Sequence, residues 1–236
     1  MKNVVLAVIG SKGKVSIDFA ASLNRTAALA EKNNIHIHFD YVEEFTSGMS
    51  TSLQKNIIAN RVLTSNTVDS LFFINPNLSW LPNDFFSLIS YEGDGIISGA
   101  YVDSFKEMES YAIALSNYDD IMDEKPKADF FSMGFVYIPK KVLQGLTQFV
   151  EKLGEGDGED VFYIFFKETV KNNLVFQEDN YFCDMVKTSG FDLLVDPKVN
   201  CTNNATISLR TDYLDYLKRS WIGKMGEENA QDMTQN

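Results

Sequence analysis

The sequence is poor in the residues that build metal, redox and nucleophile sites. Its 236 residues include only two cysteines and two histidines. Cys183 and Cys201 lack a spacing that suggests metal or redox chemistry, which favours a reducing compartment. His36 and His38 would share one face of a strand without an evident third metal ligand, so a solvated strand face is expected there. With so few histidines, a Ser-His-Asp hydrolase is also disfavoured.

Basic charge and long apolar runs are also lacking. Lys plus Arg number 21 and Asp plus Glu number 33, which gives a net charge of −12. This balance disfavours a general nucleic-acid binder or an anionic membrane surface, although a helix N-terminus or a local cation can still hold a small phosphate. No segment reaches the roughly 18 apolar residues of a membrane span. We therefore expect no membrane insertion and a cytoplasmic location, in the host cytoplasm if the source is a virus. The oligomeric state stays open.

Short apolar runs and helical patterns alternate through the first half of the chain. Hydrophobic residues make up 44% of the sequence and aromatic residues 13%, enough for a substantial core. The strand-like runs are separated by segments with apolar residues three or four apart. This β-α-β rhythm predicts a mainly parallel sheet with helices on both faces, and ligands bind at the C-terminal ends of strands in such sheets. The predicted strands span residues 3–10, 35–42, 70–74 and 95–102.

The second half is less regular, but it contains no linker that would divide the chain. We expect one domain over residues 1–223 and a disordered polar tail over residues 224–236. The predicted elements are a strand over residues 109–115, a strand over 130–139 interrupted at Gly134, an amphipathic helix over 140–153, a helix from the Glu178 region that stops at Gly190, a strand near 191–197, and a helix that starts at Thr211.

Four segments carry a family resemblance through their order and spacing. They read "INPNLSWLPNDFFSLI", "GIISGAY", "MGFVYIPKKVL" and "QEDNYFCDMVKTSGFDLLVDPKV". Together, over about residues 3–203, they resemble the GT-A glycosyltransferases, above all the compact viral and bacterial members. The resemblance implies a three-layer α/β/α GT-A (Rossmann-like) fold with a mainly parallel mixed central sheet. It also implies transfer of a sugar from a nucleotide-diphosphate sugar to a glycan or another hydroxyl acceptor.

The chain departs from this family at the position of its Asp-x-Asp metal ligands, where Asn75-Pro76-Asn77 stands instead. The family's acids hold a divalent cation that neutralises the diphosphate leaving group. An amide oxygen can ligate a metal but carries no charge, and the metal-binding His that often follows the last strand is missing too. Three interpretations follow: transfer without metal, weak Mn²⁺ or Mg²⁺ binding through Asn77, or a degenerate relative. Apart from the resemblance, the stretch can simply be a turn.

Two adjacent acids are the candidate catalytic residues. The resemblance places the general base of an inverting transferase at the "ED" helix start, where Asp179 matches better than Glu178. Such a base removes the proton of the acceptor hydroxyl as its oxygen attacks the anomeric carbon. Acids at helix starts are also common for a structural reason, since the helix dipole favours them.

The candidate donor-binding residues lie at the ends of the first and third predicted strands and on the helix between them. Backbone N–H groups of the glycine-bearing loop could face the nucleotide, and lysines and an arginine could meet the phosphates. An ordinary turn and a solvated helix face are the alternatives. The candidates are Ile9, Gly10, Ser11, Lys12, Lys55, Arg61, Asn75 and Asn77, with Lys14 and Asn56 as further possibilities.

The acceptor side is expected to combine small and aromatic residues. The resemblance places Ser132 and Gly134 on the acceptor-side strand, where small residues let a sugar approach the backbone, and Trp80 and Tyr101 could stack on a sugar face. The alternative for each aromatic ring is the core. A catalytically degenerate domain that binds a nucleotide or a glycan is the competing function. A nucleotidyltransferase is a weaker option, because it too needs acidic metal ligands.

Overall fold

A computed structural model describes residues 1–9, 14–40, 49–105, 109–116, 124–155, 161–171 and 173–204. The chain divides into residues Met1–Asn204 and Ala205–Asn236, and the description below concerns the first unit. The helix expected from Thr211 and the tail over residues 224–236 lie outside the described residues, so the predicted domain boundary stays a prediction. No helix in the described part of the chain is both long and apolar enough to cross a membrane.

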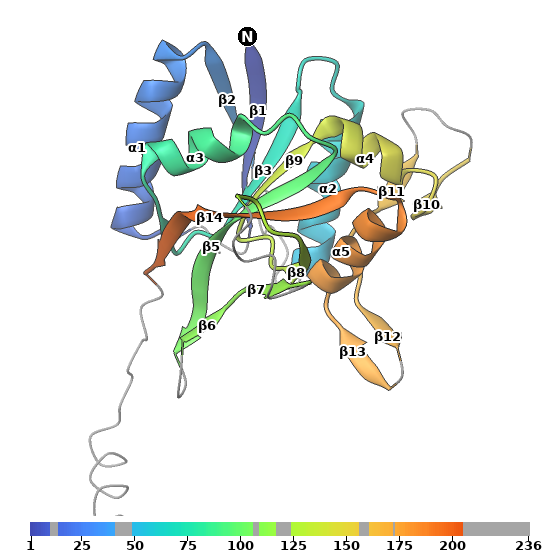
Figure 1. Ribbon diagram of the computed structural model, residues 1–236. Coiled ribbons are helices and arrows are strands. Elements are labelled where there is room, and N and C mark those ends of the chain that lie inside the picture. Colours follow the sequence, from blue (N-terminus) through green and yellow to red (C-terminus); the bar gives the residue numbers. More distant parts are fainter. Residues whose placement is uncertain are drawn as a thin grey trace, which may run out of the picture. The chain divides into compact units, whose positions relative to one another are not determined.

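The first unit is built on a mixed sheet in the order β2-β1-β3-β9-β5-β14-β4, with β6 paired to β5 (Figure 1). Strands β1 and β2, β1 and β3, and β5 and β14 pair in parallel, whereas β9 runs antiparallel to both β3 and β5. The mainly parallel mixed sheet is therefore confirmed. The strand bounds are β1 Lys2–Val8, β2 Ile35–Asp40, β3 Ser70–Ile74, β4 Leu78–Ser79, β5 Gly95–Phe105, β6 Glu109–Tyr111, β9 Phe135–Pro139 and β14 Asp192–Asn203.

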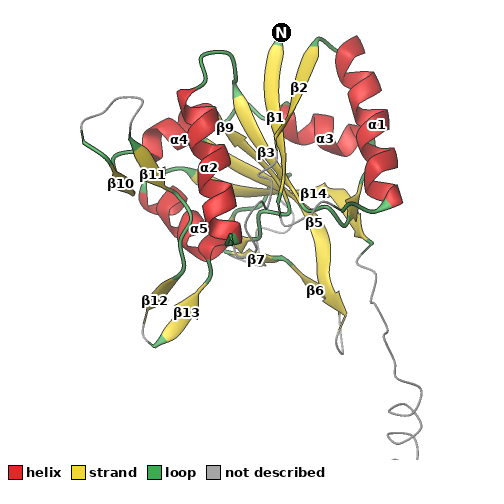
Figure 2. Ribbon diagram, turned by 180° about the vertical axis from the view of Figure 1, so that it is seen from behind, coloured by secondary structure: helices red, strands yellow, loops and turns green. Residues whose placement is uncertain are grey.

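Helices cover both faces of this sheet, as Figures 1 and 2 show. The alternation of side chains along β3 explains why, because Phe72 and Ile74 enter one apolar cluster and Leu71 and Phe73 enter another. The first cluster includes residues of α1 and α3, and the second includes residues of α2, α4 and α5. The three-layer arrangement is confirmed. The helices are α1 Ile17–Lys32, α2 Thr51–Thr64, α3 Pro82–Ile89, α4 Lys140–Leu146 and α5 Glu178–Thr188.

Local sequence signals set several helix ends. Ser16 Oγ accepts the Phe19 N–H at 3.0 Å, and Ser50 Oγ accepts the Leu53 N–H at 3.3 Å, so both serines are N-caps. Gly190, just beyond α5, has a φ of +83°, a conformation that glycine adopts without penalty. The expected stop of α5 at Gly190 is thus confirmed.

Two predicted elements in the second half were wrong. The segment 109–115 forms two strands, β6 and β7, and β7 (Ile113–Leu115) pairs with β8 (Ala128–Phe131). The helix expected over residues 140–153 ends at Leu146, because β10 (Glu151–Leu153) pairs instead with β11 (Phe162–Ile164). A hairpin of β12 (Thr169–Lys171) and β13 (Leu174–Phe176) had no counterpart in the prediction.

Candidate functional site

A pocket of about 310 Å³ lies where the C-terminal ends of β1 and β3 meet the first turns of α2 and α5. This is the edge of the sheet at which the fold class places its ligands. Five separate segments of the chain contribute to its wall. The lining residues are Ile9, Thr51, Lys55, Ile74, Asn75, Pro76, Asn77, Ser132, Met133, Gly134, Gln177, Glu178 and Asp179.

The Asn75-Pro76-Asn77 stretch is both a turn and part of the pocket wall. Asn75 Oδ1 accepts the Asn77 N–H at 2.9 Å, and the Asn75 carbonyl accepts the Leu78 N–H at 3.0 Å. The Asn75 N–H donates to the Gly134 carbonyl at 2.8 Å, which ties the turn to the start of β9. Asn77 is exposed, and its side-chain amide makes no hydrogen bond within the described part of the chain. Asn75 therefore shapes the turn, and Asn77 offers its amide to the pocket.

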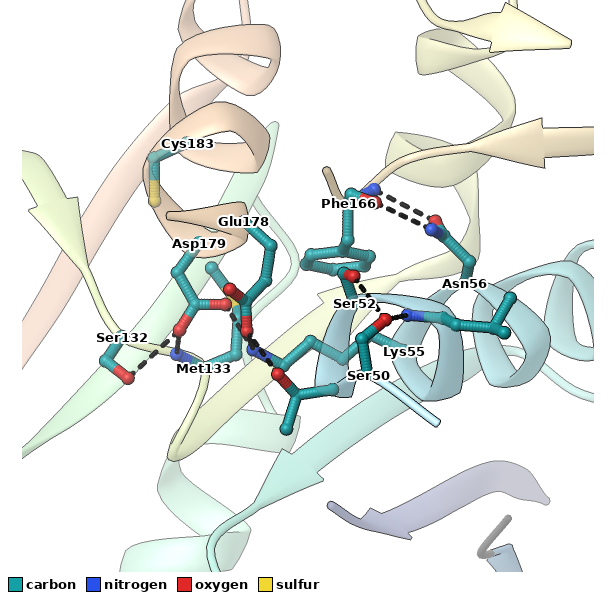
Figure 3. A network of polar contacts seen from close by, with 12 residues as sticks. Ser50, Ser52, Lys55, Asn56, Ser132, Met133, Phe166, Glu178, Asp179 and Cys183 are labelled. Carbon is teal, nitrogen blue, oxygen red and sulfur yellow. Dashed lines mark hydrogen bonds and ion pairs between the residues drawn. The ribbon is translucent and has the colours of Figure 1, made fainter. Parts of the chain in front are cut away.

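Lys55 of α2, which also lines the pocket, is held between the two acids that begin α5 (Figure 3). Its Nζ lies 3.0 Å from Glu178 Oε1 and 2.5 Å from Asp179 Oδ1. Lys55 is only 6% exposed, so its charge is nearly removed from solvent. A buried ammonium needs opposite charges at this distance, because the cost of losing its hydration is otherwise unmatched.

Asp179 uses its second oxygen as well. Oδ2 accepts the Ser132 hydroxyl at 3.0 Å and the Met133 backbone N–H at 3.0 Å (Figure 3). Both carboxylate oxygens are thus engaged, although the residue still lines the pocket. A carboxylate offers about four acceptor positions. Three are used within the described residues, so an acceptor hydroxyl can reach Asp179 at the remaining position on Oδ1 or by replacing one of these contacts.

Glu178 is the more accessible member of the acid pair and is held in its ionised form. Burial raises the pKa of this carboxyl, but the charge and hydrogen bond of Lys55, a backbone hydrogen bond and the Thr51 hydroxyl outweigh burial. The net effect lowers its pKa below the usual value. The Thr51 Oγ1 donates to Glu178 Oε1 at 2.9 Å, the same oxygen that contacts Lys55.

The residues of this pocket do not fit a divalent cation as they stand. The two carboxylates already surround an ammonium, and Asn75 Oδ1 already accepts the N–H of Asn77. A divalent cation prefers several anionic oxygens free to coordinate it. Among the described residues, no group of three or more His, Cys, Asp or Glu side chains is arranged to hold a metal.

Two of the four acceptor-side candidates are in the core rather than in the pocket. Trp80 is 4% exposed, packs edge-on against Phe19 and donates its indole N–H to Thr26 Oγ1 at 3.0 Å. Tyr101 is 2% exposed, so neither ring presents a face on which a sugar could stack. Ser132 and Gly134 do line the pocket. A Cβ at Gly134 would lie 2.1 Å from the Tyr101 hydroxyl, so ring packing already requires glycine here.

The donor-side candidates also include residues that line the pocket and residues that do not. Ile9, Lys55, Asn75 and Asn77 line the pocket, whereas Arg61 does not. The Arg61 guanidinium instead contacts Asp40 Oδ1 at 2.7 Å. Gly10, Ser11 and Lys12 lie outside the described residues, and Lys14 is exposed and away from the lining.

Asn56, another donor-side candidate, is committed to holding the backbone. Its amide donates to the Phe166 carbonyl at 2.7 Å and accepts the Phe166 N–H at 2.9 Å. Sequence reasoning missed Thr51, Gln177 and the Met133 N–H as parts of the pocket. The one available signal was Thr51, which stands in the first turn of a helix that already supplied Lys55.

The chain matches no protein-family model and no curated protein sequence. It does resemble solved structures. A197 from STIV is similar with a TM-score of 0.51 and 16% identity, covering 85% of this chain and 84% of that chain. A Drosophila galactosyltransferase 7 mutant, in complex with manganese, UDP-Gal and xylobiose, has a TM-score of 0.49 and 11% identity over 91% of this chain and 74% of that one.

An inositol-1-phosphate CTP transferase from T. maritima has a TM-score of 0.46 and 11% identity, covering 91% of this chain and 93% of that chain. At such identities the likeness concerns the fold alone. The likeness to A197 shows a shared α/β fold, and the three-layer arrangement around a mainly parallel mixed sheet agrees with the fold that the sequence motifs implied.

Proposed function

We propose that the protein is a glycosyltransferase that moves a sugar from a nucleotide-diphosphate sugar to a hydroxyl acceptor. The observation that supports this most is the pocket itself. It brings the Asn75–Asn77 turn, at the usual donor-diphosphate position, to the same cavity as Asp179, the candidate base. These residues are about a hundred positions apart in the sequence, yet they meet where the fold places ligands.

In the proposed reaction, Asp179 takes the proton of the acceptor hydroxyl as that oxygen attacks the anomeric carbon. The bond to the donor diphosphate breaks, the diphosphate leaves with the bonding electrons, and the anomeric configuration inverts. The donor lies across the ends of β1 and β3, near Ile9 and Asn77, with Lys55 as a candidate phosphate cation. Lys12, which lies outside the described residues, is a second candidate. The free cysteines Cys183 and Cys201 fit the proposed reducing, cytoplasmic setting.

The test is thermal unfolding of the protein with a panel of nucleotides and nucleotide sugars, each with and without Mn²⁺. A ligand that binds only the folded state raises the unfolding midpoint by mass action. A rise with one nucleotide sugar supports the proposal and names the donor class. No rise with any donor, with or without Mn²⁺, would contradict it.

The alternative is a degenerate GT-A-like domain that binds a nucleotide or a glycan without turnover. One observation favours it: both oxygens of Asp179 already have partners, Lys55 on one side and Ser132 with Met133 on the other. A donor that raises the midpoint but yields neither free nucleoside diphosphate nor transferred sugar, over a broad set of hydroxyl acceptors, would favour this alternative.

A further inference from the structure

The cation of the pocket is already part of the protein. Among the described residues that line the cavity, Lys55 alone carries a positive charge, and Glu178 and Asp179 alone carry negative charges. The charge of this trio is therefore −1. The side chains of Lys55, Glu178 and Asp179 are 7%, 13% and 12% exposed, so solvent screens their attraction much less than it would at the surface.

The ammonium occupies the place where a metal ion would have to bind. Nζ contacts one oxygen of each acid, and Thr51 Oγ1 donates to the same Glu178 oxygen. These are the hard oxygen ligands that a divalent cation prefers. A cation that entered would stand beside a buried like charge or would have to expel Lys55, and either event is electrostatically costly.

We propose that Lys55 is the resident cation of this pocket, and that it excludes divalent metal from Glu178 and Asp179. The exclusion depends only on the three side chains. Its consequence for the substrate rests on the proposed function: a donor diphosphate would be received without metal. An ammonium has three N–H donors, and the acids use two of them. With respect to the described residues, one donor therefore remains for a phosphate oxygen of the ligand.

The inference makes a direct prediction for Lys55→Met, which removes the charge and keeps most of the side-chain volume. Glu178 and Asp179 are then left as two adjacent carboxylates without a counter-ion, and Mn²⁺ should bind between them. The expected rise in the unfolding midpoint is about 3–6 °C when free Mn²⁺ is ten times its dissociation constant. The wild-type midpoint should not move. Mn²⁺ electron paramagnetic resonance counts the bound ions independently.

Lys141→Met is the matched control. Lys141 Nζ also pairs with a carboxylate, Asp94 Oδ1 at 2.6 Å, but the pair is exposed and involves one acid only. This variant should show no Mn²⁺ response. A response in Lys141→Met equal to that of Lys55→Met would mean that any unpaired surface acid suffices, and would overturn the inference.

Three further results would overturn it: a wild-type midpoint that rises with Mn²⁺ as much as the variant's, a folded Lys55→Met that binds no Mn²⁺, or a variant that stays unfolded in Mn²⁺. If Lys55→Met folds only when Mn²⁺ is present, the inference is supported. Lys55→Gln, which keeps a hydrogen-bond donor for the acids, provides a milder second variant with the same expected sign. No donor sugar is used, so failure here is distinct from failure of the transferase proposal.

Discussion

Asn56 and Asn60 of α2 have the same side chains as Asn75 and Asn77 of the turn after β3, but their surroundings differ. Asn56 and Asn60 are 3% and 7% exposed. Each donates to a backbone carbonyl of the segment 163–166 and accepts a backbone N–H from it, at 2.7–2.9 Å. Among the described residues, the side chain of Asn75 makes one local turn contact, and Asn77 is exposed at the pocket.

The difference shows what an amide can and cannot do in this fold. An amide has both a donor and an acceptor, so it can substitute for a neighbouring strand's backbone, as Asn56 and Asn60 do. It cannot carry charge or take up a proton, so an amide at the pocket can orient a ligand but cannot replace an acid there. The predictions below test this division, beginning with the largest effect.

Changing an acid of the pocket into an amide should preserve the fold but reduce the catalytic rate. Asp179→Asn keeps an oxygen that can accept from Ser132 and Met133, and Glu178 still pairs with Lys55. The fold should survive, whereas kcat, measured with the donor that the thermal-unfolding panel selects, should fall by about 10²–10⁴, the usual contribution of a general base.

The control for that variant is Asp129→Asn. Asp129 Oδ1 also accepts from a serine and a lysine, Ser116 at 3.2 Å and Lys187 at 3.4 Å, but it lies outside the pocket. Its kcat should stay at the wild-type level. If Asp179→Asn keeps more than half of the wild-type kcat, Asp179 is not the base.

Asn56→Ala should cause the largest loss of stability among the asparagines. The Phe166 N–H and carbonyl would both lose their partner in a buried setting, and each such loss costs about 1–3 kcal/mol. We expect the free energy of unfolding to drop by about 2–4 kcal/mol, measured by urea denaturation. A drop below about 1 kcal/mol would mean that water or a shifted backbone replaces the amide.

Particular elements also show how much of the fold could be predicted from the sequence. The apolar run of β3 is a local signal, and the strand predicted over residues 70–74 is the strand observed. The end of α4 was not predicted correctly, because residues 147–153 have a helical pattern and the pairing of Glu151–Leu153 with β11 depends on a distant partner. A local pattern of apolar residues contains no information about strand pairing with a distant segment.

The candidate site divides in the same way. The order of the motifs predicted that Asp179 and Asn77 share one pocket. It did not predict that both carboxylate oxygens of Asp179 already have partners. That state depends on Lys55, Ser132 and Met133, which come from two other segments. The burial of Trp80 was not predictable either, because an aromatic ring beside a turn can face the core or a ligand equally well.

A pH titration should distinguish Glu178 from an amide at the same position. The folded-state pKa of Glu178 is lowered below its usual 4.5, so its stabilising effect is present above that value and is lost as pH falls through the folded-state pKa. Between pH 6 and pH 3, the stability of the wild type should fall more steeply than that of Glu178→Gln. Equal slopes in urea denaturation across this range would contradict the lowered pKa.

Asn77→Ala should have the smallest effect on stability, because its exposed amide has no partner within the described residues. We expect a change in unfolding free energy within about 0.5 kcal/mol, in contrast to Asn56→Ala. The same variant should weaken donor binding in the thermal assay. A large loss of stability would show that Asn77, like Asn56, has a structural task.

The separation of Lys55 from its counter-ions along the chain has a consequence for synthesis on the ribosome. Glu178 and Asp179 follow Lys55 by 123 and 124 residues. At about 5–20 residues per second, about 6–25 s pass between translation of the lysine and of the acids. During that interval the nascent α2 has a cation that it cannot bury, so its first turn must stay hydrated. The pocket is therefore among the last parts of the nascent chain to close, after most of the sheet has been made.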